Sequence, residues 1–166
     1  MTLSLFDCSI PRYLRMLRNV ATWIDKAEAH AKESGGDVSA LLGARLAPDM
    51  APFTRQVQFL SDAAKGGAAR LAGVQPPSFP DVETTLPELK ERIAKTVAFV
   101  ETIKREQVEG REGATIELPV PNRVLTFSGE EFLFGFSMPN FLFHVVTAYG
   151  LLRSQGAPLG KMDYLA

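Results

Sequence analysis

The sequence predicts a mainly α-helical protein that folds as an up-down four-helix bundle with a small β-hairpin between the third and fourth helices. Three observations favour this fold class. Apolar residues recur at alternating steps of three and four along four long segments, the spacing of helices that each bury one face. Proline, glycine and capping sequences separate these segments. One short stretch before the last segment is instead rich in β-branched residues.

Length and composition indicate one globular domain over residues 1–166. A chain of 166 residues is an ordinary size for one core. It is 46% hydrophobic and 22% charged, which excludes an intrinsically disordered protein. The formal charge of -1 provides no basic surplus for nucleic acid, so we expect no nucleic-acid partner.

The first helix is expected to end at about Glu33, before a Gly35-Gly36 C-cap. Pro11 is compatible with an early turn of this helix. A short helical turn is expected to follow, from an Asp37 cap through Leu42. The buried face of the first helix consists of Ile10, Tyr13, Leu17, Val20, Ile24, Ala27 and Ala31.

The second helix is expected to start after Pro52 and to run to Gly73. Its Gly66-Gly67 pair weakens the helix by about 1 kcal/mol per glycine, which predicts a close helix contact or a bend. Its apolar face consists of Phe53, Val57, Leu60, Ala64 and Leu71, while Arg55, Gln58, Asp62 and Lys65 are expected to point outward.

A proline-rich connection should lead to the third helix, which opens on a capping box of Thr85 and Glu88 and continues to Ile103. The stretches TIEL and RVLTF, between Thr115 and Phe127, predict a hairpin connected by residues 119–122. This hairpin is expected to cap the bundle.

The fourth helix is expected from a second capping box, Ser128 and Glu131, to about Arg153, with a kink at Pro139. Residues 132–152 carry no Asp, Glu, Lys or Arg and reach the length of a membrane span. Pro139, Asn140 and His144 within the segment favour a buried bundle helix, so we expect no membrane association. The tail after this helix is expected to be a surface loop.

A polar stripe on the fourth helix is the most informative candidate site. At 100° per residue its four side chains fall within roughly 80° of one another. Because buried polar groups need partners, two interpretations remain open: a hydrogen-bond network between helices, or a small polar pocket at the bundle axis. The stripe consists of Ser137, Asn140, His144 and Thr147.

Gln56 on the second helix lies near the edge of its apolar face, where it would meet this stripe or bond to nearby backbone. His30, near the end of the first helix, is expected to be a solvated histidine that suits a helix C-terminus. Arg12, Arg15 and Arg18 are expected to form a solvated flank of the first helix.

Familiar catalytic arrangements are excluded by spacing. Ser137 and His144 are about 10 Å apart along a helix, too far for a nucleophile-base pair. The stretch AAKGGAARLAG lacks the spacing of a phosphate-binding loop. Acidic residues fall at caps or on outer faces, which predicts no paired carboxylates for acid-base chemistry or a di-iron site. Cys8 is the single cysteine, so no intrachain disulfide forms.

The segments RLAPDM, TRQVQ, AAKGGAARLAG, PSFPD, LTFSGEEFLFGFSMPNFLFH and PLGKMDYL make nearly the whole chain resemble a bacterial domain of unknown function, number nineteen ninety-three. That family is similar in fold to the DinB-like and YfiT-like helical bundles, which include metalloproteins, thiol-dependent transferases and many dimers. The resemblance implies a three-histidine metal site, with one ligand on the second helix and two spaced i, i+4 on the last. Those positions here are Gln56, Asn140 and His144.

Side-chain amides are weak ligands for zinc or nickel, so we expect no metal cofactor. Two hypotheses follow. One is a binding or interaction protein that kept the bundle and lost the metal, with a possible small-molecule ligand at the stripe. The other is an enzyme, such as a transferase or hydrolase, that uses His144 in the axial polar pocket as general base or acid, with or without a divalent metal bound at His144. The resemblance also implies a homodimer. The cysteine content and the absence of a signal-peptide pattern in the N-terminal segment predict a cytoplasmic location.

Overall fold

A computed structural model describes residues 4–166, so the first three residues of the N-terminal segment considered above lie outside it. Most of the described chain is helical, and the single sheet is a two-stranded hairpin, as predicted. The elements are α1 (Leu5–Glu33), α2 (Val38–Gly43), α3 (Phe53–Ala72), α4 (Leu86–Thr102), α5 (Arg105–Val108), β1 (Ile116–Val120), β2 (Arg123–Phe127), α6 (Gly129–Glu131), the π-helical turn η1 (Phe132–Ser137), α7 (Met138–Ser154) and α8 (Lys161–Leu165).

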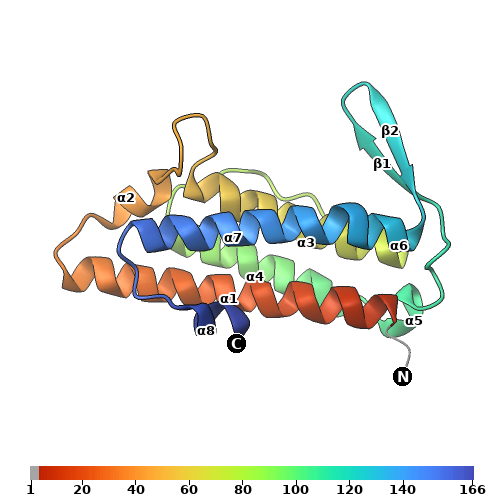
Figure 1. The fold of residues 1–166 in the computed structure, drawn as a ribbon, viewed down its shortest axis with the longest axis horizontal. Helices are drawn as coiled ribbons and strands as arrows, with labels where there is room; N and C mark the ends of the chain where they lie inside the picture. Colours follow the sequence, from red (N-terminus) through yellow and green to blue (C-terminus); the bar gives the residue numbers. More distant parts are fainter. Residues whose placement is uncertain (1–3) are drawn as a thin grey trace.

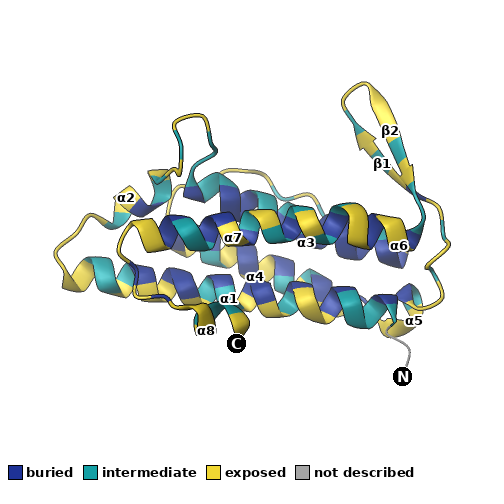
Figure 2. Cartoon of the chain, in the orientation of Figure 1, coloured by how far each residue is buried: buried dark blue, intermediate teal, exposed yellow. Residues whose placement is uncertain are grey.

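Four long helices, α1, α3, α4 and α7, form the bundle (Figure 1). Each packs mainly against two neighbours: α3 lies between α4 and α7, and α1 closes the ring on the opposite side. Buried residues line the inward faces of all four helices, and exposed residues cover the outer faces (Figure 2). The buried apolar side chains form one cluster, which includes Trp23, Leu60, Leu89 and Val145.

The helix starts follow the predicted capping chemistry. Thr85 and Glu88 form a reciprocal capping box at α4, and Ser128 and Glu131 form the second one at α6. The Asp37 side chain caps α2 by accepting a hydrogen bond from the amide of Ser39. These local interactions satisfy backbone donors that a helix start leaves free, which is why the predicted boundaries lie close to the observed ones.

The directions of the helices differ in one respect from the predicted up-down order. The Ser61–Thr96 hydrogen bond joins the middles of α3 and α4, and both helices run in the same direction (Figure 1). The connection between them, residues 74–85, makes this arrangement possible. When extended it spans up to roughly 40 Å, more than the roughly 30 Å of a 20-residue helix.

This connection buries side chains of α3 that were expected to point outward. Gln58 and Lys65 are buried, and Gln58 donates a hydrogen bond to Glu83 in the connection at 2.8 Å. The Lys65 ammonium lies over the ring of Phe79, 5.2 Å from its centroid. The prediction that these residues are solvated was wrong because helical periodicity does not report where a long loop crosses a helix.

A buried arginine lies at the centre of this contact. The Arg92 side chain on α4 is 1% exposed and forms ion pairs with Asp62 at 2.8 Å, Asp81 at 3.0 Å and Glu83 at 3.0 Å. Burial alone would raise the pKa of Glu83, but hydrogen bonds from Gln58, its own backbone and Arg92 lower it below its usual value. Asp62, Asp81 and Glu83 therefore share one buried cation, and carboxylates held in ion pairs with Arg92 are not the free pair that acid-base chemistry or a di-iron site needs.

The last long helix contains a π-helical turn instead of a sharp kink. It runs from α6 through η1 to α7, and η1 ends where the Met138 amide donates to the carbonyl of Leu133. Pro139 follows directly, has no amide hydrogen and would crowd the carbonyl four residues earlier in a regular α-helix. The wider turn accommodates the proline, so the distortion lies one turn before the predicted kink.

The hairpin projects from one end of the bundle and does not cap it (Figure 1). Its strands are paired to the Val120–Arg123 position, so the connection is Pro121 and Asn122, shorter than predicted. Asn122 adopts a left-handed φ of 69°, which asparagine tolerates in a turn. Only Ile116, at the base of the hairpin, is fully buried, because the two strands extend away from the bundle (Figure 1).

The tail after α7 was predicted to be a loop but contains the short helix α8. The Tyr164 ring stacks on Trp23 at a centroid distance of 5.9 Å, and the indole NH donates to the carbonyl of Asp163. In residues 4–166 one helical stretch, Gly129–Ser154, has the length and composition of a membrane span, and its most apolar window is 39% buried. In the fold this stretch packs along α3 and α1.

Candidate functional site

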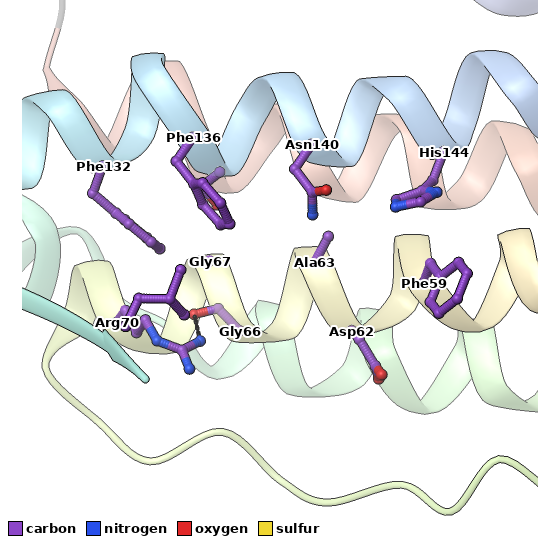
Figure 3. A pocket seen from close by; sticks show the side chains of 12 residues that line it. Phe59, Asp62, Ala63, Gly66, Gly67, Arg70, Phe132, Phe136, Asn140 and His144 are labelled. Carbon is purple, nitrogen blue, oxygen red and sulfur yellow. Dashed lines mark hydrogen bonds between the residues drawn. The ribbon is translucent and has the colours of Figure 1, made fainter. Parts of the chain in front are cut away.

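A pocket of about 330 Å³ lies between α3 and the η1–α7 helix, beside the base of the hairpin. Figure 3 shows its lining side chains on the two helices: Phe136 and Asn140 point from η1–α7 toward α3, while Asp62 points away from α7. It is open to solvent on one side and combines aromatic with polar walls. The lining residues are Phe59, Asp62, Ala63, Gly66, Gly67, Arg70, Leu118, Phe132, Phe136, Ser137, Asn140 and His144.

His144 on α7 and Gln56 on α3 are joined by a hydrogen bond of 2.8 Å between Nδ1 and Oε1. The Gln56 amide nitrogen donates to the carbonyl of Ala51 at 3.1 Å, which leaves the amide oxygen to face the imidazole. An amide oxygen only accepts, so Nδ1 carries the proton and Nε2 carries the lone pair of the neutral ring. The contact proposed between Gln56 and the polar stripe is therefore present.

The environment of His144 favours this neutral form. The ring is half-buried between Phe59, at 5.0 Å between ring centroids, and Phe143, at 5.2 Å. Burial lowers the pKa of His144 because the imidazolium form loses water without gaining a carboxylate. Nε2 has no hydrogen-bond partner among residues 4–166 and is not among their buried unpaired atoms, so it reaches solvent.

Ser137 closes the floor of the pocket through a hydroxyl pair with Tyr13 of α1. The two oxygens are 2.8 Å apart, and burial raises the pKa of Tyr13, which keeps the phenol protonated. Gly67 makes this approach possible, since a Cβ there would lie 2.4 Å from the Ser137 oxygen. The close helix contact predicted at the glycine pair is thus observed at Gly67.

The remaining predicted residues divide between the pocket and other places. Asn140 lies on the pocket wall between Phe136 and His144, with no side-chain hydrogen bond to residues 4–166 (Figure 3). Thr147 is turned away from the site and donates to the carbonyl of Phe143 in its own helix at 2.7 Å. The polar stripe therefore contains both predicted features. Ser137 and His144 form hydrogen bonds to other helices, and Ser137, Asn140 and His144 line a pocket.

The other residues singled out from the sequence lie outside this pocket. His30 is half-exposed near Gly156, at the opposite end of α1 from Tyr13. Arg12 and Arg15 are exposed and lie with the half-buried Cys8 beside a separate groove between α1 and η1. Arg18 is exposed and pairs with Glu101 on α4.

Sequence reasoning missed the largest part of the pocket wall. Arg70 and the rings of Phe59, Phe132 and Phe136 surround the polar stripe, and Leu118 reaches it from the hairpin. The phenylalanines have the spacing of ordinary core residues, and the hairpin contact is not encoded in any local pattern. One feature of the sequence could have indicated that Arg70 lines the site. Gly66 and Gly67 have no side chains, which leaves room beside the helix for the Arg70 side chain to fold back.

Comparison with known proteins identifies the family of this chain. Residues 5–165 match the family described as "Domain of unknown function (DUF1993)". The chain belongs to this family. A crystal structure of a DinB family member from Shewanella denitrificans is 40% identical, with a TM-score of 0.88, and the match covers 98% of this chain and 92% of that one. A search of the curated proteins found no match.

In this DUF1993 chain the side chains at the implied metal positions do not fit a transition-metal site. His144 provides one free imidazole nitrogen, and the oxygen of Gln56 is already occupied by the Nδ1 proton of the same ring. Asn140 adds only a neutral amide, a weak ligand for zinc or nickel. Within residues 4–166 no three His, Cys, Asp or Glu side chains are grouped to hold an ion.

Proposed function

We propose that this protein binds a small organic molecule in the pocket between α3 and α7, through side chains alone. The observation that carries the proposal is that Asn140 and His144 line a solvent-open pocket, while Gln56 and Ser137 are used in hydrogen bonds within the protein. Asn140 and His144 Nε2 have no partners among residues 4–166, while three phenylalanine rings supply apolar surface. Apolar walls with a few convergent polar groups are the usual composition of a small-molecule site.

A pocket-filling substitution tests this proposal. Ala63 lines the pocket and Ala98 is exposed on α4, so Ala63→Trp and Ala98→Trp add the same side chain inside and outside the site. Ligands are first found by ligand-observed NMR with a fragment library and untagged protein. We expect Ala63→Trp to abolish their binding and Ala98→Trp to preserve it. Equal binding to both variants would refute the pocket as the site.

An enzyme that uses His144 is the second candidate, and the tautomer of His144 favours it. Gln56 holds the proton on Nδ1, so the lone pair of Nε2 is presented to the pocket side of the ring, as a general base requires. His144→Gln retains a polar side chain without a basic nitrogen. If the protein is an enzyme, this variant should still bind the molecule but no longer convert it, as followed by NMR over hours.

We also propose a cytoplasmic location and a homodimeric state for the protein. The half-buried Cys8 is a free thiol and the chain has no second cysteine, which suits a reducing cytoplasm. We expect the protein to act there as a homodimer. Phe143 and Val146, which are exposed on the outer face of α7, support the second expectation.

A further inference from the structure

Arg70 stands out among the charged residues of the pocket because it has no acidic partner. Its side chain is half-buried at the C-terminal end of α3, and its Nη1 donates one hydrogen bond, of 3.1 Å, to the carbonyl of Gly66. None of the ion pairs among residues 4–166 includes Arg70. A guanidinium has five N–H donors, so most of its donor capacity is unused by protein side chains.

The fold makes room for this cation. A Cβ at Gly66 would lie 2.8 Å from the Arg70 Nη1, so the absence of a side chain lets the guanidinium fold back beside the helix and line the pocket. Burial lowers the pKa of Arg70, which reflects the cost of removing the cation from water, yet arginine stays charged at neutral pH. A partly desolvated cation without a counter-ion favours an anion beside it.

The other ionisable groups on the wall do not cancel this charge. Asp62 also lines the pocket, but its Oδ1 receives Arg92 at 2.8 Å and Lys65 at 2.9 Å, so two cations already compensate it. Burial lowers the pKa of His144, which favours its neutral form. Arg70 is therefore the uncompensated charge of the pocket among the described residues.

The arrangement of the wall indicates what an anion at Arg70 would be attached to. In Figure 3 Arg70 lies at the end of the pocket near Phe132, while His144 and Phe59 lie at the other end, with Phe136 and Asn140 between them. Phenylalanine rings offer flat apolar contacts to aromatic or planar groups. A ligand that fills the site is then acidic at one end and apolar in the middle.

We propose that Arg70 anchors the acidic group of the ligand, a carboxylate or a phosphate, and that the site selects small aromatic acids over their neutral analogues. This inference rests on the proposed binding function and names the ligand class for the same pocket. Bidentate pairing between a guanidinium and an oxyanion supplies both strength and orientation. Asn140 and His144 then contact polar groups at the far end of the ligand.

The test compares matched probes on matched variants. The probes are 3-phenylpropionate, its neutral analogue 3-phenylpropanamide, and phenyl phosphate, each titrated by calorimetry and by protein-observed NMR. The variants are Arg70→Gln, Arg70→Lys and, as a control that removes an exposed arginine outside the pocket, Arg12→Gln. Circular dichroism and thermal unfolding establish that each variant is folded.

We expect wild type and Arg12→Gln to bind an acid about tenfold or more tightly than the amide, the effect of one charge-assisted hydrogen-bond pair. In Arg70→Gln the acids should fall to the affinity of the amide, and the amide should be unaffected. Arg70→Lys should retain part of the preference. Whichever of phenyl phosphate and 3-phenylpropionate binds more tightly identifies the preferred acid group.

The outcomes separate this inference from the proposed function. If acid and amide bind wild type equally, or if Arg70→Gln keeps the preference for acids, the anchor is refuted while the pocket stands. If none of the three probes shifts NMR signals of pocket residues, this ligand class is refuted. The fragment screen with Ala63→Trp then decides by itself whether the pocket binds any small molecule.

Discussion

The hydrogen bond between Gln56 and His144 determines which nitrogen of the imidazole meets the pocket. A histidine that is half-buried between two phenylalanines loses hydration in its charged form, and the neutral amide of Gln56 supplies no negative charge to compensate the imidazolium. Burial therefore favours the neutral imidazole, and the hydrogen bond from Nδ1 to Gln56 determines its tautomer. The neutral ring and the amides beside it determine how the site responds to metal ions and to pH.

The first prediction is that the purified protein binds no stoichiometric zinc, nickel or manganese. One imidazole and two amides form a poor donor set, and the Gln56 oxygen is already used by His144. Elemental analysis must use untagged protein, since a histidine tag binds metal itself. One equivalent of a transition metal, lost in His144→Ala, would overturn this prediction and favour the enzyme hypothesis.

The second prediction concerns stability at mildly acidic pH. Burial lowers the pKa of His144 below 6.5, so in the window beneath 6.5 the unfolded chain binds more protons than the folded one. Stability then rises with pH across this window and falls on acidification. His144→Gln should flatten this part of the urea-midpoint profile between pH 5 and about 7. Acidic groups such as Glu83 titrate below 4.5 and leave a separate slope there.

Packing between elements depends on two sites where the helices approach each other closely. At Gly67 a methyl group would lie 2.4 Å from Ser137 and 2.6 Å from the Tyr13 hydroxyl, whereas at Gly135, in η1, it would meet nothing within 4 Å. We expect Gly67→Ala to destabilise the protein by about 1–3 kcal/mol through overpacking. Gly135→Ala should be neutral or stabilising by up to about 1 kcal/mol. Urea unfolding of both variants measures the difference, and equal midpoints would contradict it.

The connection between α3 and α4 is held by Arg92, which yields the next prediction. Arg92→Met keeps the apolar stem but leaves Asp62, Asp81 and Glu83 without their shared cation. Asp62 and Asp81 are partly exposed and keep Lys65 and Arg55 as partners, so the loss comes mainly from Glu83 and should be about 1–3 kcal/mol. Arg18→Met removes an exposed ion pair with Glu101 and should cost less than about 1 kcal/mol. A similar loss in both variants would show that the cluster does not hold the connection.

The ends of the helices could be predicted from the sequence where capping residues within a few positions determine them. The capping boxes at Thr85 and Ser128, and the glycine that ends α3, act within a few residues, so their boundaries follow from the sequence. The parallel course of α3 and α4 and the burial of Arg92 depend on where a long connection crosses the bundle. Helical periodicity describes one helix at a time, and it contains no information about that crossing.

The site was predictable to the extent that it lies on one helix face. Ser137, Asn140 and His144 line the pocket because three- and four-residue steps place them on one side of the last helix. Thr147 shares that side, but its hydroxyl reaches a carbonyl of its own helix, a competing bond that spacing does not exclude. Arg70 belongs to another helix, and its place in the site follows only from tertiary packing.

On the scale of the whole molecule, α7 separates the pocket from an apolar surface. Leu46, Phe143 and Val146, which we call the outer patch, are each at least half exposed. Leu46 lies near Gly150 of α7, so the patch is continuous along the helix. The outer patch and the pocket residues of α7 are centred about 110° apart around the helix. A partner on the outer patch would therefore leave the pocket open.

The last prediction is that the protein is a homodimer that associates through the outer patch. Exposed aliphatic and aromatic side chains that cluster on one face of a monomer are unfavourable in water and mark interaction surfaces. A twofold dimer buries the same patch from both copies.

Val146→Glu places two carboxylates in that interface, while Val82→Glu makes the same change at an exposed valine in the connection before α4. Light scattering should give a dimer for wild type and Val82→Glu and an 18.2 kDa monomer for Val146→Glu. Monomeric wild type at high micromolar concentration would refute association, and a dimeric Val146→Glu would move the interface to another face.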